Sequence, residues 1–147
     1  MEYDPYASHL KILETMCYSH VLEIGGGKHS TVHFLSKPYL KELVTVEANA
    51  EWRVELLKLC TDARWDLRST IPLDLTPFDL IFIDNGEDAN PQARVRAIEQ
   101  VAQSELKEGV RVIVHDFENQ FYQHAALPFP HVEIDRELTP WTAILWR

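Results

Sequence analysis

Short apolar runs alternate along this chain with segments in which apolar residues recur every three or four positions. The short runs are typical of strands, and the spaced residues are typical of helices with one apolar face. Five runs predict strands, at 20–24, 43–47, 63–67, 79–83 and 110–114. Two later runs, at 132–135 and 141–146, flank a turn near 137–140 and predict an antiparallel hairpin.

The spaced segments predict helices between the strands. Asp4 followed by Pro5 is typical of an N-cap and a first helical residue, so a helix is expected over 5–17. A second helix is expected over 31–37, where Pro38 stops it.

Two more helices are expected in the middle of the chain. One is capped by Asn49 and turns Trp52, Leu56 and Leu59 to one face. The other starts at Asn90 and Pro91 and is ended by Gly109.

This alternation predicts an α/β fold. The expected architecture is a doubly wound, Rossmann-like sheet of seven strands, mostly parallel, with the C-terminal hairpin antiparallel. Such sheets bind ligands at the carboxyl ends of their strands. The polar residues that end the predicted strands should therefore share one edge: Glu23, Glu47, Asp84, His115 and Asp116.

Composition narrows the class of protein. The 147 residues, 46% of them hydrophobic, are enough for one core, so a single domain over 1–147 is expected. The net charge of −9 disfavours nucleic acid as a partner. No apolar run approaches the roughly 20 residues of a membrane span, and the first residues do not resemble a signal peptide. Two cysteines without Cys-x-x-Cys spacing fit a reduced, cytoplasmic protein.

A glycine turn follows the first predicted strand. Gly25, Gly26 and Gly27 allow positive φ and close approach of a ligand, and Ser30 or Thr31 can begin a helix whose N–H groups suit an anion. By themselves, three glycines are about as consistent with a plain tight turn as with a ligand-binding loop. The spacing to Glu47, the acid that ends the second strand, favours ligand binding.

The acidic strand ends and the aromatic residues also have structural interpretations. Glu47 is alternatively a solvated strand end, and Asp84 and Asp116 are alternatively caps or loop carboxylates. Trp52, Trp141 and Trp146 are expected in the core rather than against a cofactor, and most histidines are expected at the surface or in packing.

Four motifs in order resemble the class I S-adenosylmethionine-dependent methyltransferases. They are Val-Leu-Glu-Ile-Gly-Gly-Gly at 21–27, Val-Thr-Val-Glu-Ala at 44–48, Phe-Asp-Leu-Ile-Phe-Ile-Asp at 78–84 and Gly-Val-Arg-Val-Ile-Val-His-Asp at 109–116. The resemblance covers roughly residues 8–147 and includes the terminal hairpin. The strings around Ser30 and Asp84 look most like small-molecule O-methyltransferases of the catechol or sugar type.

The resemblance implies that S-adenosylmethionine is held at the ends of the first four strands. Glu47 would accept the ribose hydroxyls, Asp66 would lie near the adenine amino group, and Asp84 would lie near the methyl donor. The glycine loop would lie under the methionine part. The implied cofactor residues are Glu23, Gly25, Gly26, Gly27, Ser30, Glu47, Ala48, Asp66 and Asp84.

The resemblance also implies methyl transfer to a small-molecule acceptor, with a hydroxyl as the expected group. Such a reaction needs a base or a metal for the acceptor proton. Asp84, Asp116 and His115 are the catalytic candidates, and Asp84 with Asp116 would be oxygen ligands for Mg²⁺. Phe117 departs from the pattern of metal-using relatives, which have Asn or Asp there.

Two further interpretations stay open. The chain holds little besides the core, so a homo-oligomer or a partner subunit is expected to close the site, or the chain itself is a catalytically incomplete partner subunit. The spacing Gly25-x-Gly27-x-x-Ser30, followed by Glu47, partly matches a dinucleotide fingerprint and would indicate a nicotinamide-dependent oxidoreductase.

Overall fold

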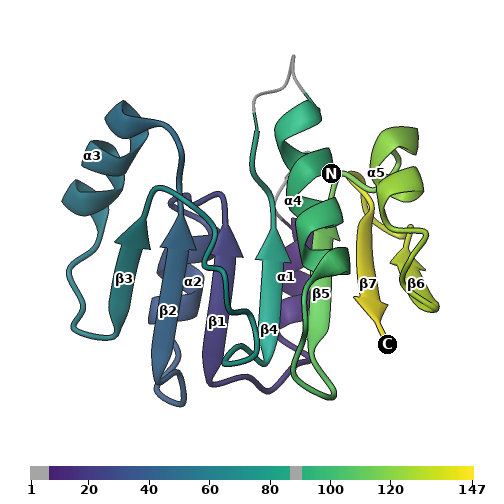
Figure 1. Ribbon diagram of the computed structural model, residues 1–147. Helices are drawn as coiled ribbons and strands as arrows, with labels where there is room; N and C mark the ends of the chain where they lie inside the picture. The colour runs from purple at the N-terminus through teal and green to yellow at the C-terminus, as the bar shows by residue number, and fades with distance from the viewer. Residues whose placement is uncertain (1–6, 87–90) are drawn as a thin grey trace.

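The computed structural model describes residues 7–86 and 91–147, which form one seven-stranded sheet with helices on both faces (Figure 1). The strand order is β3-β2-β1-β4-β5-β7-β6. The predicted seven-stranded, mostly parallel α/β sheet is confirmed. The strands are β1 (His20–Ile24), β2 (Glu42–Val46), β3 (Trp65–Arg68), β4 (Leu80–Ile83), β5 (Arg111–His115), β6 (His131–Asp135) and β7 (Thr142–Trp146).

The first five strands are parallel, and β7 is antiparallel to both of its neighbours. After β5 the chain runs to the edge of the sheet, where it forms β6. It then returns to form β7 between β5 and β6. This arrangement confirms the predicted antiparallel hairpin. The carboxyl ends of β1 to β5 therefore lie along one edge of the sheet (Figure 1).

In the described part of the chain five helices accompany the sheet, and α1 and α2 lie on the face opposite to α4 and α5 (Figure 1). Helix α3 lies near the edge strand β3 and its neighbour β2 (Figure 1). The helices are α1 (Ala7–Leu13), α2 (Ser30–Leu35), α3 (Ala50–Leu59), α4 (Gln92–Gln103) and α5 (Gln120–Ala125).

Alternation along the strands divides the core into two clusters. Leu22 and Ile24 of β1 pack with the apolar residues of α4, whereas Val21 of the same strand packs with those of α1 and α2. Successive side chains of a strand point to opposite faces, so Glu23 is directed to the same face as Val21. Both faces of β1 are buried, as expected for a central parallel strand.

Several predicted helix boundaries differ from the structure. Helix α1 ends at Leu13 rather than near 17, and the proposed starts at Asp4, Pro5 and Asn90 lie outside the described residues. Helix α4 ends at Gln103, because Leu106 pairs with Leu75 in a β-bridge instead of continuing the helix.

Helix α5 was absent from the sequence prediction. Its N-cap is Asn119, whose side chain accepts a hydrogen bond from the Phe121 N–H at 2.9 Å. Asn is a favoured N-cap residue, so this position was the available local signal.

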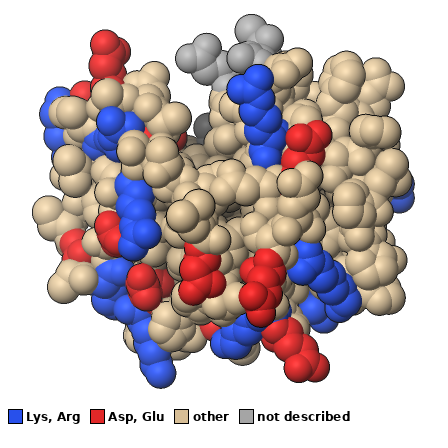
Figure 2. Space-filling view, viewed as in Figure 1, with Lys and Arg blue, Asp and Glu red and all other residues tan. Residues whose placement is uncertain are grey.

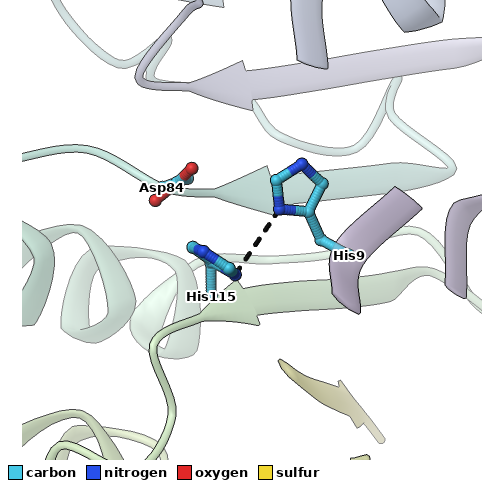
Figure 3. A group of neighbouring side chains, drawn as sticks. All are labelled: His9, Asp84 and His115. Carbon is cyan, nitrogen blue, oxygen red and sulfur yellow. Dashed lines mark hydrogen bonds between the residues drawn. The ribbon is translucent and has the colours of Figure 1, made fainter. Parts of the chain in front are cut away.

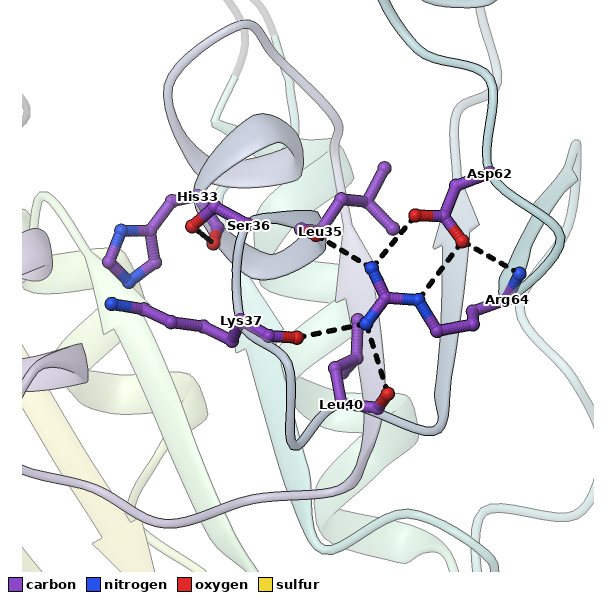
Figure 4. Close-up of polar contacts among 7 residues, drawn as sticks. All are labelled: His33, Leu35, Ser36, Lys37, Leu40, Asp62 and Arg64. Carbon is purple, nitrogen blue, oxygen red and sulfur yellow. Dashed lines mark hydrogen bonds and ion pairs between the residues drawn. The ribbon is translucent and has the colours of Figure 1, made fainter.

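The start of β3 is fixed by Arg64 (Figure 4). Its guanidinium donates to the carbonyl oxygens of Leu35, Lys37 and Leu40 at 2.7 to 3.1 Å, and Asp62 pairs with it at 2.8 Å. The Arg64 N–H donates to the Asp62 carboxylate in a turn, which explains why the strand begins at 65 rather than 63. This contact joins the C-terminal end of α2 to β3.

The surface viewed in Figure 2 has Lys and Arg side chains intermixed with Asp and Glu, most densely toward the amino ends of the parallel strands. A hollow lies near the carboxyl ends, where fewer charged side chains are visible. Among the described residues, every helix is too short or too polar to cross a bilayer.

Candidate functional site

The glycine loop leaves β1 in a conformation that requires glycine at its first position. Gly25 has a φ of 88°, and a Cβ there would lie 2.5 Å from the carbonyl oxygen of Asp84. A Cβ on Gly26 would meet Thr45 at 2.7 Å, whereas one on Gly27 would have nothing within 4 Å. The loop is therefore pressed against β2 and β4 at its start and opens at Gly27.

Glu23 supports this loop from inside the protein. Its Oε1 accepts hydrogen bonds from the hydroxyls of Thr31 and Thr45 at 2.6 and 2.8 Å. Thr31 Oγ1 in turn accepts from the Gly27 N–H at 3.0 Å. Burial raises the pKa of Glu23 to about 7, although these hydrogen bonds oppose the shift. The side chain is fully buried, so it acts on the loop and not on a ligand directly.

Glu47 lies at the carboxyl end of β2, where the chain turns into α3. The Asn49 N–H donates to Glu47 Oε1 at 3.1 Å, and the Asn49 side chain caps α3 by accepting from the Trp52 N–H, which confirms the predicted cap. Arg53 donates to the carbonyl oxygens of Glu47 and Ala48 at 2.7 and 3.0 Å. Hydrogen bonds between side chains and the backbone therefore hold the turn between β2 and α3. The Glu47 side chain is only partly buried.

Trp52 was predicted to be a core residue, and the structure corrects this. It is 38% exposed, and its Nε1 donates to the carbonyl oxygen of Gly26 at 2.7 Å. Leu59 of the same helix is 48% exposed, so among the three apolar residues predicted to share a face only Leu56 is buried. The reason is that the glycine loop, not the sheet, lies against the first turn of α3.

A cavity of about 750 Å³ opens between the ends of β1, β2 and β4. This volume is in the usual range for a small-molecule site, about 300 to 1,000 Å³. Among the predicted residues, those that line it are Gly25, Gly26, Glu47, Ala48 and Asp84. A smaller cavity of about 240 Å³ adjoins it and is lined by Gly27, Ser30 and again Asp84.

Other predicted residues do not line these cavities. Asp66 is exposed and pairs with Arg68 at 2.8 Å, while Ser69 and Thr70, just beyond β3, line the larger cavity. The strand continues one residue past its predicted end, so the residues at its carboxyl edge are later in the sequence than expected. Glu23, His115 and Asp116 are likewise outside both linings.

Arg94 of α4 lies between the two carboxylates expected to bind Mg²⁺. Its Nη2 is 3.1 Å from Asp84 Oδ1 and its Nη1 is 2.7 Å from Asp116 Oδ2. It also donates to the backbone carbonyls of Asn85 and His115, and it is only 6% exposed. A fixed cation already compensates the pair, so the structure gives no support to Mg²⁺ between Asp84 and Asp116.

A second group forms behind Asp84. His9 of α1, His115 at the end of β5 and Asp84 each offer a ligand atom within 4.8 Å of the others (Figure 3). The two Nδ1 atoms are 3.5 Å apart, and the ring planes meet at 84°. Burial, and then the charge on His115, lower the pKa of His9 to about 3.

Sequence reasoning missed His9 and Arg94. His9 shares a helix face with Ile12 and Leu13, which are core residues, so its burial was predictable from the apolar spacing of α1. Its contact with His115 spans 106 positions and leaves no local pattern. Arg94 lies among apolar positions of α4, where a single buried cation indicates a carboxylate partner.

No protein-family model matches the sequence, and no curated protein matches it. Solved structures do match. The N-methyltransferase NodS from Bradyrhizobium japonicum is 13% identical, with a TM-score of 0.66 over 95% of this chain and 92% of NodS. A ribosomal protein L11 methylase from Lactobacillus delbrueckii is 19% identical, with a TM-score of 0.67 over 94% of this chain and 74% of the methylase.

Larger proteins contain the same arrangement. A Nostoc punctiforme protein is 12% identical, with a TM-score of 0.64 over 97% of this chain, which spans 56% of its length. NodS has also been solved with S-adenosyl-L-homocysteine, and a spermidine synthase in complex with AdoDATO matches with a TM-score of 0.59 and 18% identity. At these identities the likenesses show a shared fold.

Proposed function

We propose that this chain, which has the fold of the class I S-adenosylmethionine-dependent methyltransferases, transfers a methyl group from that cofactor to a small-molecule acceptor. The observation that carries the proposal is the cavity bounded by the glycine loop, the carboxylate of Glu47 and the carboxylate of Asp84. It lies at the carboxyl ends of the parallel strands, where this type of sheet binds its ligands.

The residues around the cavity fit the parts of S-adenosylmethionine. Glu47 offers two carboxylate oxygens for the two ribose hydroxyls, as its position at the end of β2 favours. Gly27 leaves open space in the adjoining cavity. Ser30 lines the same cavity at the start of α2, and backbone N–H groups at the start of a helix suit the methionine carboxylate. Ser69 and Thr70 replace Asp66 as the polar residues proposed near the adenine.

When bound, S-adenosylmethionine supplies an electrophilic methyl group, whose carbon–sulfur bond breaks with the electron pair returning to sulfur. The protein has to align the acceptor, exclude water and take up the acceptor proton. Asp84 is the one predicted catalytic carboxylate that lines the cavity, and we assign it to the acceptor proton. Asp116 and the backbone carbonyl of His115 contact Arg94, which contacts Asp84, so they position Asp84 through Arg94.

The acceptor group that we propose is a hydroxyl. Hydroxyls of small molecules have high pKa values, so their methylation needs a nearby group that accepts the proton, and the Asp84 carboxylate, which Arg94 holds in place, borders the cavity. The fold alone does not select the acceptor, since an N-methyltransferase, a ribosomal protein methylase and a spermidine synthase share it.

Topology supports this proposal over a nicotinamide-dependent oxidoreductase. The usual dinucleotide-binding sheet has strand order 3-2-1-4-5-6, all parallel. Here the antiparallel β7 lies between β5 and β6, and NodS has the same kind of fold. Mixing with NADH should leave NADH fluorescence unchanged.

Calorimetric titration with S-adenosyl-L-homocysteine tests the proposal. We expect one site per chain and a loss of about 10- to 100-fold in affinity for Glu47→Gln, because a hydrogen bond to a charged group is worth about 1.5–3 kcal/mol. Glu51→Gln, at an exposed position four residues later, is the matched control and should bind as the wild type does. Absence of binding by the wild type at millimolar ligand would refute the proposal.

A second candidate is a partner subunit that binds the cofactor without completing the reaction. Val54 and Leu57 of α3 are 52% and 57% exposed, and exposed apolar side chains of this kind suit contact with another protein chain. Methylation assays on fractions from size-exclusion chromatography, with their masses measured by light scattering, distinguish the two. Activity in a monomer fraction favours the complete enzyme, and activity only with an added partner favours the subunit.

A further inference from the structure

We propose that His9, Asp84 and His115 form a binding site for a divalent transition-metal ion, with Zn²⁺ as the representative ion. The three side chains converge from α1 and from the ends of β4 and β5 (Figure 3). Two imidazoles and one carboxylate are a common set of three protein ligands for zinc, in which the fourth position is left for water or substrate.

The strand register brings Asp84 and His115 together. Ile83 of β4 pairs with Val114 of β5, so the next residue on each strand lies beside the other. Phe82 and Ile113, two positions earlier, belong to the core cluster on the α1 face, which places Asp84 and His115 on that face as well. The ligand positions are thus set by the sheet rather than by a mobile loop.

Helix α1 supplies the third side chain. His9 packs edge-on against Phe82, with ring centroids 5.1 Å apart, and its Nδ1 faces the Nδ1 of His115 at 3.5 Å. That separation is long for a hydrogen bond. It is close to the distance of about 3.3 Å between two nitrogens on a tetrahedral zinc ion with bonds of about 2.0 Å.

The surrounding groups orient the proposed ligands. His115 Nε2 lies 3.6 Å from Asp116 Oδ1, which is beyond hydrogen-bond length but places the carboxylate beside the ring, where histidine ligands commonly have such a partner. Asp116 is held by Arg94, which also contacts Asp84 Oδ1 at 3.1 Å. Arg94 therefore fixes the position of Asp84 relative to the end of β5.

The nature of the ligands selects the ion. Imidazole nitrogen suits Zn²⁺, Co²⁺, Ni²⁺ or Fe²⁺, whereas Mg²⁺ prefers oxygen. The site is therefore distinct from the expected pair of Asp84 and Asp116, which Arg94 bridges. Asp84 also lines both cavities, so an ion held by it would border the acceptor space.

The role of such an ion in methyl transfer deepens the proposed function and rests on it, whereas the binding site itself is tested independently of that function. A bound ion would lower the pKa of an acceptor hydroxyl that coordinates it, and the acceptor proton would pass to water. Asp84 would then be a ligand, and its assignment to the acceptor proton applies to the protein without the ion. The acceptor oxygen forms a bond to the methyl carbon, and the electron pair of the broken carbon–sulfur bond remains on sulfur.

Zinc binding to chelator-treated protein, measured by competition with a chromophoric chelator, tests the site. We expect one equivalent of Zn²⁺ in the wild type, and X-ray absorption at the zinc edge should show two imidazole ligands. His9→Asn should abolish stoichiometric binding, and Asp116→Asn should weaken it by about 10- to 100-fold. The control His124→Asn removes an exposed histidine and should bind as the wild type does.

Folding of each variant is checked by circular dichroism. The X-ray absorption spectrum of the wild type tests the site even if a variant fails to fold. Absence of stoichiometric zinc in the wild type, or equal binding by His9→Asn, would overturn the metal site. Titration of the same samples with S-adenosyl-L-homocysteine separates the two proposals. Zinc binding without cofactor binding retains the metal site and rejects the methyltransferase.

Discussion

The Thr31 hydroxyl donates a hydrogen bond of 2.6 Å to Oε1 of Glu23, a carboxyl group that is fully buried. The same hydroxyl accepts from the Gly27 N–H at 3.0 Å. The buried carboxyl group of Glu23 on β1 is thereby linked, through the Thr31 side chain, to the backbone of the glycine loop. The state of Glu23 should therefore affect stability and the shape of the loop together.

Stability should depend on the protonation of Glu23. Its pKa in the folded protein is about 7, against 4.5 for the ordinary side chain, so the folded state favours the protonated form. The associated stability is fully present below about pH 4.5 and is lost as the pH rises to about 7, by up to about 3 kcal/mol. Urea unfolding across this range should show that Glu23→Gln lacks this fall. Equal slopes for Glu23→Gln, the wild type and the exposed control Glu51→Gln would contradict it.

Gly25→Ala should destabilise the protein by several kcal/mol, because the new Cβ would meet the Asp84 carbonyl oxygen at 2.5 Å at a φ of 88°. Gly27→Ala is the matched control for stability. Nothing lies within 4 Å of its Cβ, so its free energy of unfolding should change by less than about 0.5 kcal/mol. It should still weaken S-adenosyl-L-homocysteine binding, since Gly27 lines the smaller cavity. Urea unfolding and calorimetry measure the two effects, and similar stability of both variants would refute the strained turn.

Arg94→Met should lower the free energy of unfolding by about 3 kcal/mol, because it leaves Asp84 and Asp116 without their cation. This is the lower end of the usual range, since the Asp116 side chain is 38% exposed. Arg96→Met, at an exposed position on the same helix, should change stability little. Chemical denaturation compares the two, and equal midpoints would show that the buried network is not stabilising.

Trp52→Phe keeps a ring beside the cavity and removes the hydrogen bond to the Gly26 carbonyl oxygen. We expect S-adenosyl-L-homocysteine to bind about 2- to 10-fold more weakly, which corresponds to the usual net value of one hydrogen bond. Val54→Ala, on an exposed part of α3, should bind normally. Wild-type tryptophan fluorescence should change on binding and the variant should lose most of that change. An unaltered response in Trp52→Phe would place the ligand elsewhere.

Much of the fold was predictable because short segments of the sequence carry the apolar patterns and cap residues that determine it. The apolar strands β1, β2, β4 and β5 were found within one residue of their bounds, since buried parallel strands are continuous apolar runs. Asn49 was identified as a cap from its position before a spaced apolar segment. Helix α5 is six residues long and has too few turns to show a period, and it lacks the glycine turn that precedes α2, a predicted helix of the same length.

The site was predictable only in part, because its remaining contacts join distant residues. The glycine loop and Glu47 line one cavity as their order in the chain indicated. The contact of His9 with His115 and the bridge that Arg94 makes to Asp84 depend on which helix covers which strand end. Trp52 shows the opposite error, since its apolar character predicted the core whereas its indole N–H binds the loop.

The position of β7 constrains the order in which the sheet can be assembled. Strand β6 pairs only with β7 among the strands described, and β7 comes after it in the chain. During synthesis β6 therefore has no strand partner until residues 142–146 have left the ribosome and paired with β5. The first five strands can form their parallel sheet earlier, so the edge of β5 remains an open template for pairing until the last strand arrives.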